Sequence, residues 1–306
     1  MAVAAEPEQQ LAWEARQRPR AAIAAIVAAF LTLAGYLWAG LDLRDTPRAG
    51  FLESFSNALE PGPIGSRPSV KGPLFEYYDA HSTTIVGSAV VRSLALVALG
   101  WAVTFLAAAT RARRPEFLRL VVYLPLVGAA LAAVSTVAGA IGTISAVSEF
   151  LDGPRTVDAA RDVGGGSLLI TAEILGQIGP LALVAGLFLI ALNAMRVGLL
   201  TRFLGFLGII AAVLTILPLM PLPVIQSFWL VGVGLLLLGA VPGGMPPAWR
   251  TGKAEPWPSN REAAASRREA AAAKPREAPE PAAEPQPVPA GRAHPSSKKR
   301  KRKRRD

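Results

Sequence analysis

Long apolar runs constrain this chain more than any other feature of its sequence. They cover residues 21–41, 85–109, 121–144, 168–192, 203–219 and 224–241. A helix of about 20 residues rises about 30 Å, which matches the hydrocarbon core of a bilayer. Runs of this length mark membrane spans rather than core helices of soluble proteins. The sequence therefore predicts an all-α, polytopic transmembrane helix bundle with about six spans.

Two of these assignments have alternatives. The arginines at 16–20 precede the first run, as the basic flank of a cleaved signal peptide would. The run is long for a signal peptide and ends in the bulky pair Leu37 and Trp38, so we favour an uncleaved anchor. The last two runs are short, and prolines punctuate the turn between them. They form either two spans or one re-entrant hairpin, and both return the chain to the same side.

The distribution of basic residues predicts the orientation. Dense Arg and Lys clusters lie before the first run, in the joints 111–119 and 196–202, and at the C-terminus, whereas loops 42–84 and 145–167 carry sparser, mixed charge. All the dense clusters fall on one side, and the positive-inside rule places that side in the cytoplasm. We therefore predict a multi-pass plasma membrane protein with both termini in the cytoplasm. Its parts are an N-terminal segment 1–20, a transmembrane domain 21–241 and a tail 242–306.

The tail is predicted to be disordered, because residues 259–297 are rich in Ala, Pro, Glu and Arg and cannot bury a core. It ends in a basic run that supplies most of the net charge of +10. The residues of this run are Lys298, Lys299, Arg300, Lys301, Arg302, Lys303, Arg304 and Arg305. Such a run binds anionic lipids, binds nucleic acid nonspecifically or reinforces the cytoplasmic location of the C-terminus. The membrane context favours lipids or topology, so we expect anionic lipids and not nucleic acid as partners.

Charged side chains interrupt two of the runs. Arg92 lies in the second run and Glu173 in the fourth, each about 8–10 Å from the predicted outer start of its run. A charge at a helix centre costs about 2.5–3.5 kcal/mol on insertion scales, so we predict that the two form an ion pair. In a functional interpretation, these residues and Gln177, one turn deeper, line a cavity or an ion path. The alternatives are a structural clamp and side chains that extend to the nearby interface.

Smaller patterns predict surface and packing features. The apolar side chains of 51, 52, 55, 58 and 59 share one face of a short helix, which we expect on the membrane surface. Small residues recur at four-residue spacing in the third run, from Gly128 to Gly142, and indicate either self-association or packing within the chain's own bundle. Trp249 and Trp257 are expected to anchor the chain at the inner interface.

No motif indicates catalysis. The chain has no cysteine and only two histidines, His81 and His294, which excludes thiolate chemistry and Cys-based or multi-histidine metal sites. Glu76, Asp79, His81 and Ser82 cluster in the sequence, but we interpret them as a polar membrane-entry segment rather than a metal site or relay. Phosphate-loop, zinc-protease and nucleophile-elbow motifs are absent. We predict no catalytic residue, cofactor or metal.

The segment from Asn193 to Pro258 resembles uncharacterised multi-pass membrane proteins of actinobacteria. The resemblance lies in the joint Arg196-Val197-Gly198-Leu199-Leu200-Thr201-Arg202, the proline-turned pair of runs and the Trp-Pro endings. It implies a source and no activity. Three function classes remain: a structural or assembly component of the cell envelope, a small transporter or channel subunit that uses Arg92 and Glu173, and an intramembrane enzyme. We favour them in that order, with a membrane-protein partner or a homo-oligomer as expected assemblies.

Overall fold

Helices form nearly all of the structure, which is a computed structural model that describes residues 7–48, 50–59, 61–217, 222–241, 245–257 and 265. The chain divides into a unit from Met1 to Trp257 and a second from Pro258 to Asp306. Of the predicted tail 242–306, residues 245–257 are described and include the short helix Ala248–Thr251, so this part is ordered, contrary to the prediction. The rest of the tail, except residue 265, lies outside the described residues together with its basic run Lys298–Arg305. The elements are α1 (Pro7–Asp42), α2 (Phe51–Leu59), η1 (Ile64–Ser66), α3 (Gly72–Ala80), α4 (Ser82–Arg113), α5 (Arg119–Asp152), α6 (Val157–Asp162), α7 (Ser167–Arg196), α8 (Arg202–Ile216), α9 (Val224–Leu238) and α10 (Ala248–Thr251).

In the part of the chain that the structure describes, four helices, α1, α4, α5 and α7, are long and apolar enough to cross a membrane. They contain the predicted spans 21–41, 85–109, 121–144 and 168–192. Large apolar side chains are exposed on α5 from Leu120 to Ile141 and on α7 from Leu168 to Phe188. At about 1.5 Å per residue, each stretch covers about 30 Å along the helix axis. These side chains define an apolar belt as thick as the hydrocarbon core of a bilayer.

The remaining two apolar helices are shorter than the belt. Helices α8 and α9 have 15 residues each, or about 22 Å. The sequence explains where they end: Pro218 disfavours helix at the residue before it, and Pro223 stands immediately before α9. The structure thus contains four long apolar helices and one hairpin of two short ones, where the sequence predicts about six spans.

The six helices pack in a ring. Helix α1 packs on α4, α4 on α5, α5 on α7, α7 on α8, α8 on α9, and α9 returns to α1. Two glycines mark close contacts in the ring, since a Cβ on Gly208 would lie 3.0 Å from Ala191 Cβ and one on Gly234 would lie 3.0 Å from Ala22 O. From these contacts α8 and α9 run only about 12–15 Å further before they end at the hairpin turn. Beyond that level the bundle consists of α1, α4, α5 and α7.

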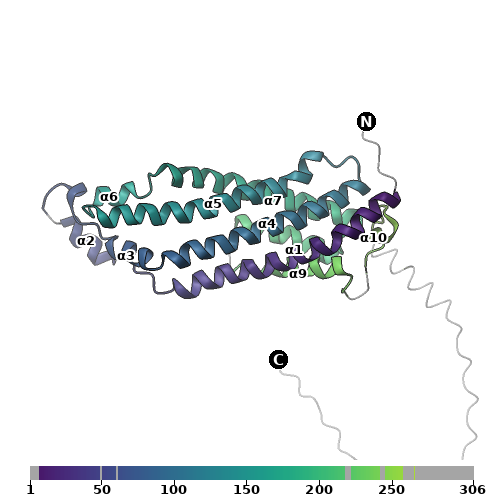
Figure 1. Ribbon diagram of the computed structural model, residues 1–306, viewed down its shortest axis with the longest axis horizontal. Helices are drawn as coiled ribbons and strands as arrows, with labels where there is room; N and C mark the ends of the chain where they lie inside the picture. Colours follow the sequence, from purple (N-terminus) through teal and green to yellow (C-terminus); the bar gives the residue numbers. More distant parts are fainter. Residues whose placement is uncertain are drawn as a thin grey trace, which may run out of the picture. The chain divides into compact units, whose positions relative to one another are not determined.

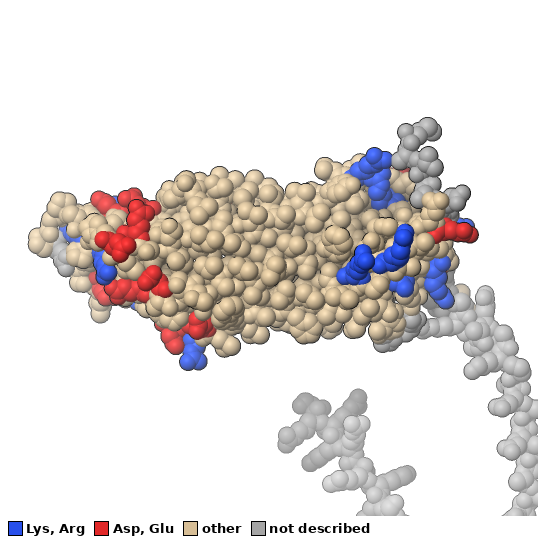
Figure 2. Space-filling view, in the orientation of Figure 1, with Lys and Arg blue, Asp and Glu red and all other residues tan. Residues whose placement is uncertain are grey.

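The two ends of the bundle, which Figure 1 shows with the helices they hold, differ in charge. Figure 2 shows Lys and Arg gathered at the end that holds α10 and Asp and Glu mainly at the end that holds α2, α3 and α6. We call the first the arginine end and the second the cap end. The arginine end carries Arg16, Arg18, Arg20, Arg111, Arg113, Arg114, Arg119, Arg196 and Arg202. Acidic residues of the cap end are Asp42, Asp45, Glu53, Glu76, Asp79, Glu149, Asp152, Asp158 and Asp162.

The two long loops fold together into the cap. The rings of Phe75 on α3 and Phe150 on α5 meet edge to face at 4.8 Å between centroids. Backbone hydrogen bonds join the loops, one from Ser69 N to Arg155 O and one from Val157 N to Arg67 O, both 2.9 Å. The predicted helix at 51–59 is confirmed as α2, with an exposed apolar face. Its location on the membrane surface stays a prediction.

The small residues of the third run pack against α7 within the same chain. A Cβ on Gly128 would lie 2.4 Å from Leu183 N, and a Cβ on Gly179 would lie 2.6 Å from Ala132 N. Such close backbone contact requires small side chains on both helices. Of the two interpretations of this pattern, the structure therefore supports packing within the bundle.

Candidate functional site

A cavity lies at the hairpin end of α8 and α9, where the ring of six helices opens. Its volume is about 460 Å³, within the range of small-molecule sites. Every helix of the ring contributes to its walls. Most of the lining is apolar, with leucines from α4, α7, α8 and α9. The polar side chains in the lining are Thr32, Tyr36, Arg92, Thr136, Thr215 and Gln226.

Of the described residues in this lining, only Arg92 carries a full charge. Its Nε donates to Ser88 O at 3.3 Å, and its Cζ lies 5.3 Å from the centre of the Tyr36 ring. Gly35 gives its stem space, because a Cβ there would lie 2.6 Å from Arg92 Cγ. Among the described residues, no carboxylate pairs with Arg92, and its terminal nitrogens donate no hydrogen bond. The cavity therefore contains a guanidinium with unused donors inside the apolar belt.

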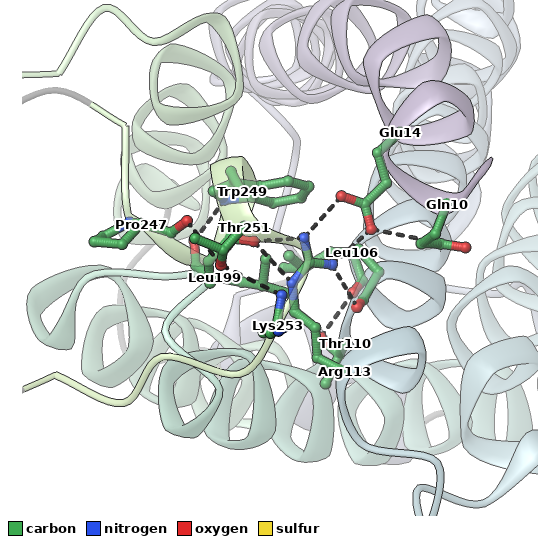
Figure 3. Close-up of polar contacts among 12 residues, drawn as sticks. Gln10, Glu14, Leu106, Thr110, Arg113, Leu199, Pro247, Trp249, Thr251 and Lys253 are labelled. Atoms are coloured by element: carbon green, nitrogen blue, oxygen red, sulfur yellow. Dashed lines mark hydrogen bonds and ion pairs between the residues drawn. The ribbon is translucent and has the colours of Figure 1, made fainter. Parts of the chain in front are cut away.

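Arg113, at the arginine end, shows how this protein satisfies the donors of a buried arginine (Figure 3). It forms a two-pronged ion pair with Glu14, with Nη1–Oε1 2.6 Å and Nη2–Oε2 2.8 Å, and both side chains are almost fully buried. Its other donors go to the carbonyl oxygens of Ala109 and Ala248. Every N–H of this guanidinium thus has an acceptor. Arg92 differs in that, among the described residues, only its Nε has an acceptor.

The neighbourhood of Arg113 also corrects one prediction. Trp249 is 4% exposed, and Arg113 Cζ lies 5.3 Å from the centre of its ring. Because the ring is buried in protein, it does not anchor the chain in lipid. Its indole nitrogen donates to Leu199 O at 2.9 Å (Figure 3). Trp257 likewise donates to Leu200 O at 2.8 Å. Both indoles satisfy backbone carbonyls of the 196–202 joint, because that joint turns back under the bundle.

Glu173 and Gln177 do not contact Arg92. Both are exposed on α7 and lie outside the cavity lining, and the predicted ion pair between Glu173 and Arg92 is not formed. The two charges nevertheless share a depth. Ser93 Oγ donates to Ala133 O, and Ser135 Oγ donates to Ala172 O, which ties α4, α5 and α7 together beside them. The prediction gave the right depth but the wrong face of α7. Ala172 and Gly179 occupy the face of α7 that packs on α5, and Glu173 and Gln177 lie on another face.

The polar cluster at the start of α4 is dispersed. Glu76 pairs with Arg155 at 2.9 Å, and His81 Nδ1 lies 2.8 Å from Tyr77 O. Across the part of the chain that the structure describes, no group of three acidic or histidine side chains is placed to hold a metal.

The sequence does not indicate the roles of three residues in these sites, Tyr36, Gln226 and Glu14. Tyr36 and Gln226 lie inside apolar runs, where an uncharged polar side chain gives a weak signal. Glu14 lies before the first apolar run, and its side chain is buried in the bundle. Its partner Arg113 is 99 residues away in the sequence, so no local pattern indicates the contact.

No protein-family model, curated protein or solved structure matches this chain. The described part of the chain defines a class: a helical bundle with four helices long and apolar enough to cross a membrane and a cavity with one arginine in its lining.

Proposed function

We propose that this chain is a multi-pass plasma membrane protein that binds an amphiphile with an anionic group, and that Arg92 is the residue that binds the anion. One observation carries the proposal: an arginine with unused donors lies in a mostly apolar cavity within the belt. A phosphate or carboxylate would satisfy the guanidinium with charge-assisted hydrogen bonds. The leucines of the lining, among them Leu96, Leu99 and Leu183, suit a hydrocarbon chain.

The proposed topology follows from charge and helix length. We place the arginine end in the cytoplasm, so that both termini are cytoplasmic and the cap is outside. The α8–α9 hairpin then enters from the cytoplasm and returns without crossing, because 15-residue helices are too short. The cavity then lies on the outer side of the hairpin tip. A phosphatase reporter fused after Asp306 should be inactive, and an active fusion would reverse this topology.

The cavity supports binding better than conduction. Between the cavity and the arginine end, the core is closed by side chains such as Leu106, Ile190 and Leu236, all 0% exposed. A transporter or channel subunit would need this half to open. A structural or assembly role in the cell envelope is our second candidate, because α2 presents exposed Leu52 and Leu59 on the cap, where a membrane-protein partner or a second copy can bind.

Arg92→Gln is the test of the proposal. The substitution keeps the size and polarity of the side chain but removes the charge, so we expect retention of phosphatidylglycerol to fall by about tenfold or more. The measurement is native mass spectrometry of the detergent-purified protein after incubation with phosphatidylglycerol or with diacylglycerol of the same chains. Wild type should retain the former and not the latter. Arg92→Lys should retain an intermediate amount, because it keeps the charge and loses the planar donors.

Two controls are needed. One distinguishes loss of the Arg92 charge from a general effect of removing an arginine, and the other distinguishes a bound lipid from a bound free anion. Arg44→Gln removes an exposed arginine from the cap end and should leave retention unchanged. Glycerol phosphate should not displace the lipid, since it lacks the chain that the leucines bind. Equal retention by wild type and Arg92→Gln would contradict the proposed function, and displacement by glycerol phosphate would assign the site to a free anion.

A further inference from the structure

The α7 wall beside the opening carries two polar side chains that the proposed function does not yet use. Glu173 and Gln177 are exposed, although both lie within the apolar belt. No hydrogen bond or ion pair joins either side chain to another described residue. A charged or amide side chain at this depth costs several kcal/mol unless it finds a polar partner, so the pair requires an explanation.

These residues face the space above α8. Further toward the arginine end, Ala191 and Met195 of α7 pack on Gly208 and Gly205 of α8. Glu173 and Gln177 continue that stripe at helical spacing, so they lie on the same face of α7. Helix α8 ends at Ile216, about 12 Å beyond Gly208, and so stops about two to three turns short of Glu173. The face of α7 that α8 covers at the arginine end is therefore open here.

Arg92 and Glu173 lie at one depth on two walls. Ser93 is bonded to Ala133, and Ser135 to Ala172, with Oγ–O distances of 2.9 and 2.7 Å. Counting about 1.5 Å per residue from these bonds along α4, α5 and α7 brings Arg92 and Glu173 to the same level. A positive side chain on α4 and a negative one on α7 thus border the part of the bundle that the short hairpin leaves uncovered.

We infer that the ligand is zwitterionic: it carries a primary ammonium group beside its anion, as an aminophospholipid headgroup does. This inference rests on the proposed function. Arg92 supplies donors for the phosphate, Glu173 accepts hydrogen bonds from the ammonium, and the Gln177 carbonyl adds an acceptor one turn deeper. A purely anionic headgroup would leave Glu173 unpartnered and beside like charge. The two walls therefore select for a headgroup with both charges.

The alternative is that Glu173 extends to the nearby interface. That route serves long Lys and Arg side chains better than a short carboxylate. It also leaves Gln177, which is about 6 Å deeper, without a partner. One ligand that satisfies both residues and Arg92 accounts for all three observations.

The test is competition between lipids. Purified wild-type protein is incubated with an equimolar mixture of phosphatidylethanolamine and phosphatidylglycerol of identical chains, and native mass spectrometry gives the ratio retained. We expect wild type to prefer phosphatidylethanolamine. Glu173→Gln should lower the ratio of phosphatidylethanolamine to phosphatidylglycerol by about threefold to tenfold, because a charge-assisted hydrogen bond is lost. Gln177→Leu should lower it less, and Glu149→Gln, an exposed carboxylate outside the belt, should not change it.

The outcomes distinguish the two proposals. If Arg92→Gln abolishes retention of both lipids and Glu173→Gln changes the ratio, both stand. If Arg92→Gln abolishes retention but neither Glu173→Gln nor Gln177→Leu changes the ratio, the zwitterionic ligand is wrong and anion binding stands. If Arg92→Gln changes nothing, both are wrong. Glu173→Asp should restore part of the preference, which a merely destabilised variant would not do.

Discussion

Replacement of Arg113 by alanine is expected to lower the free energy of unfolding by about 3–5 kcal/mol, because it leaves the Glu14 carboxylate buried without its partner. The guanidinium and the carboxylate are 0% and 2% exposed, so water cannot replace the lost contacts in the folded state. The change also removes the hydrogen bonds to Ala109 O and Ala248 O. The measurement is unfolding in mixed micelles with increasing denaturing detergent, followed by circular dichroism.

A double-mutant cycle tests whether the loss belongs to the pair. The cycle compares Glu14→Leu alone and Arg113→Leu alone with the variant that carries both substitutions. The double variant removes both charges, so it should be more stable than the sum of the two single losses implies. Arg250→Ala, an exposed arginine at the same end, should cost no more than about 0.5 kcal/mol. Simple additivity of the Glu14 and Arg113 losses would show that the two side chains do not interact.

Gly128→Ala should destabilise the contact between α5 and α7 by about 1–3 kcal/mol, since the added methyl would overlap the backbone of the facing helix. Its Cβ would lie 2.4 Å from Leu183 N, and neither backbone can yield without separating the helices. The measurement is again the free energy of unfolding in mixed micelles.

Gly139→Ala is the matched control on the same helix. Its Cβ would find its nearest neighbour, Ala172 Cβ, at 3.8 Å, which is an ordinary contact. Replacing glycine in a helix interior by alanine gains up to about 1 kcal/mol, so this variant should be neutral or more stable. If Gly128→Ala and Gly139→Ala behaved alike, the close approach of α5 and α7 at Gly128 would be refuted.

Depth along a helix could be predicted from the sequence, and rotation about its axis could not. The rise per residue is constant, so counting from the ends of the apolar runs placed Arg92 and Glu173 at one level. Helices α5 and α7 pack on protein with one face and carry the belt on the other, so both faces are largely apolar. Hydropathy therefore does not reveal which face packs on the neighbouring helix. The predicted ion pair failed for this reason.

Contacts between distant segments were equally hidden. Arg113 is one of several arginines in the 111–119 joint, and nothing local distinguishes the buried one from its neighbours. The prolines of the turn indicated that α8 and α9 are short, and the sequence already left a re-entrant hairpin as an alternative. What the sequence could not supply is the consequence: an opening in the cap half of the bundle, with Arg92 in its wall.

The central claim is that lipid occupies the opening above the hairpin, and a nitroxide spin label at Thr215→Cys tests it most directly. The natural chain lacks cysteine, so the label is unique, and Thr215 lines the cavity near the end of α8. In liposomes we expect high collision rates with oxygen and low rates with a water-soluble nickel complex, as for a label at the belt residue Val134. Rapid collision with nickel, as for a label at Glu149 outside the belt, would show a water-filled opening and contradict the account. Inaccessibility to both reagents would show a closed bundle and contradict it as well.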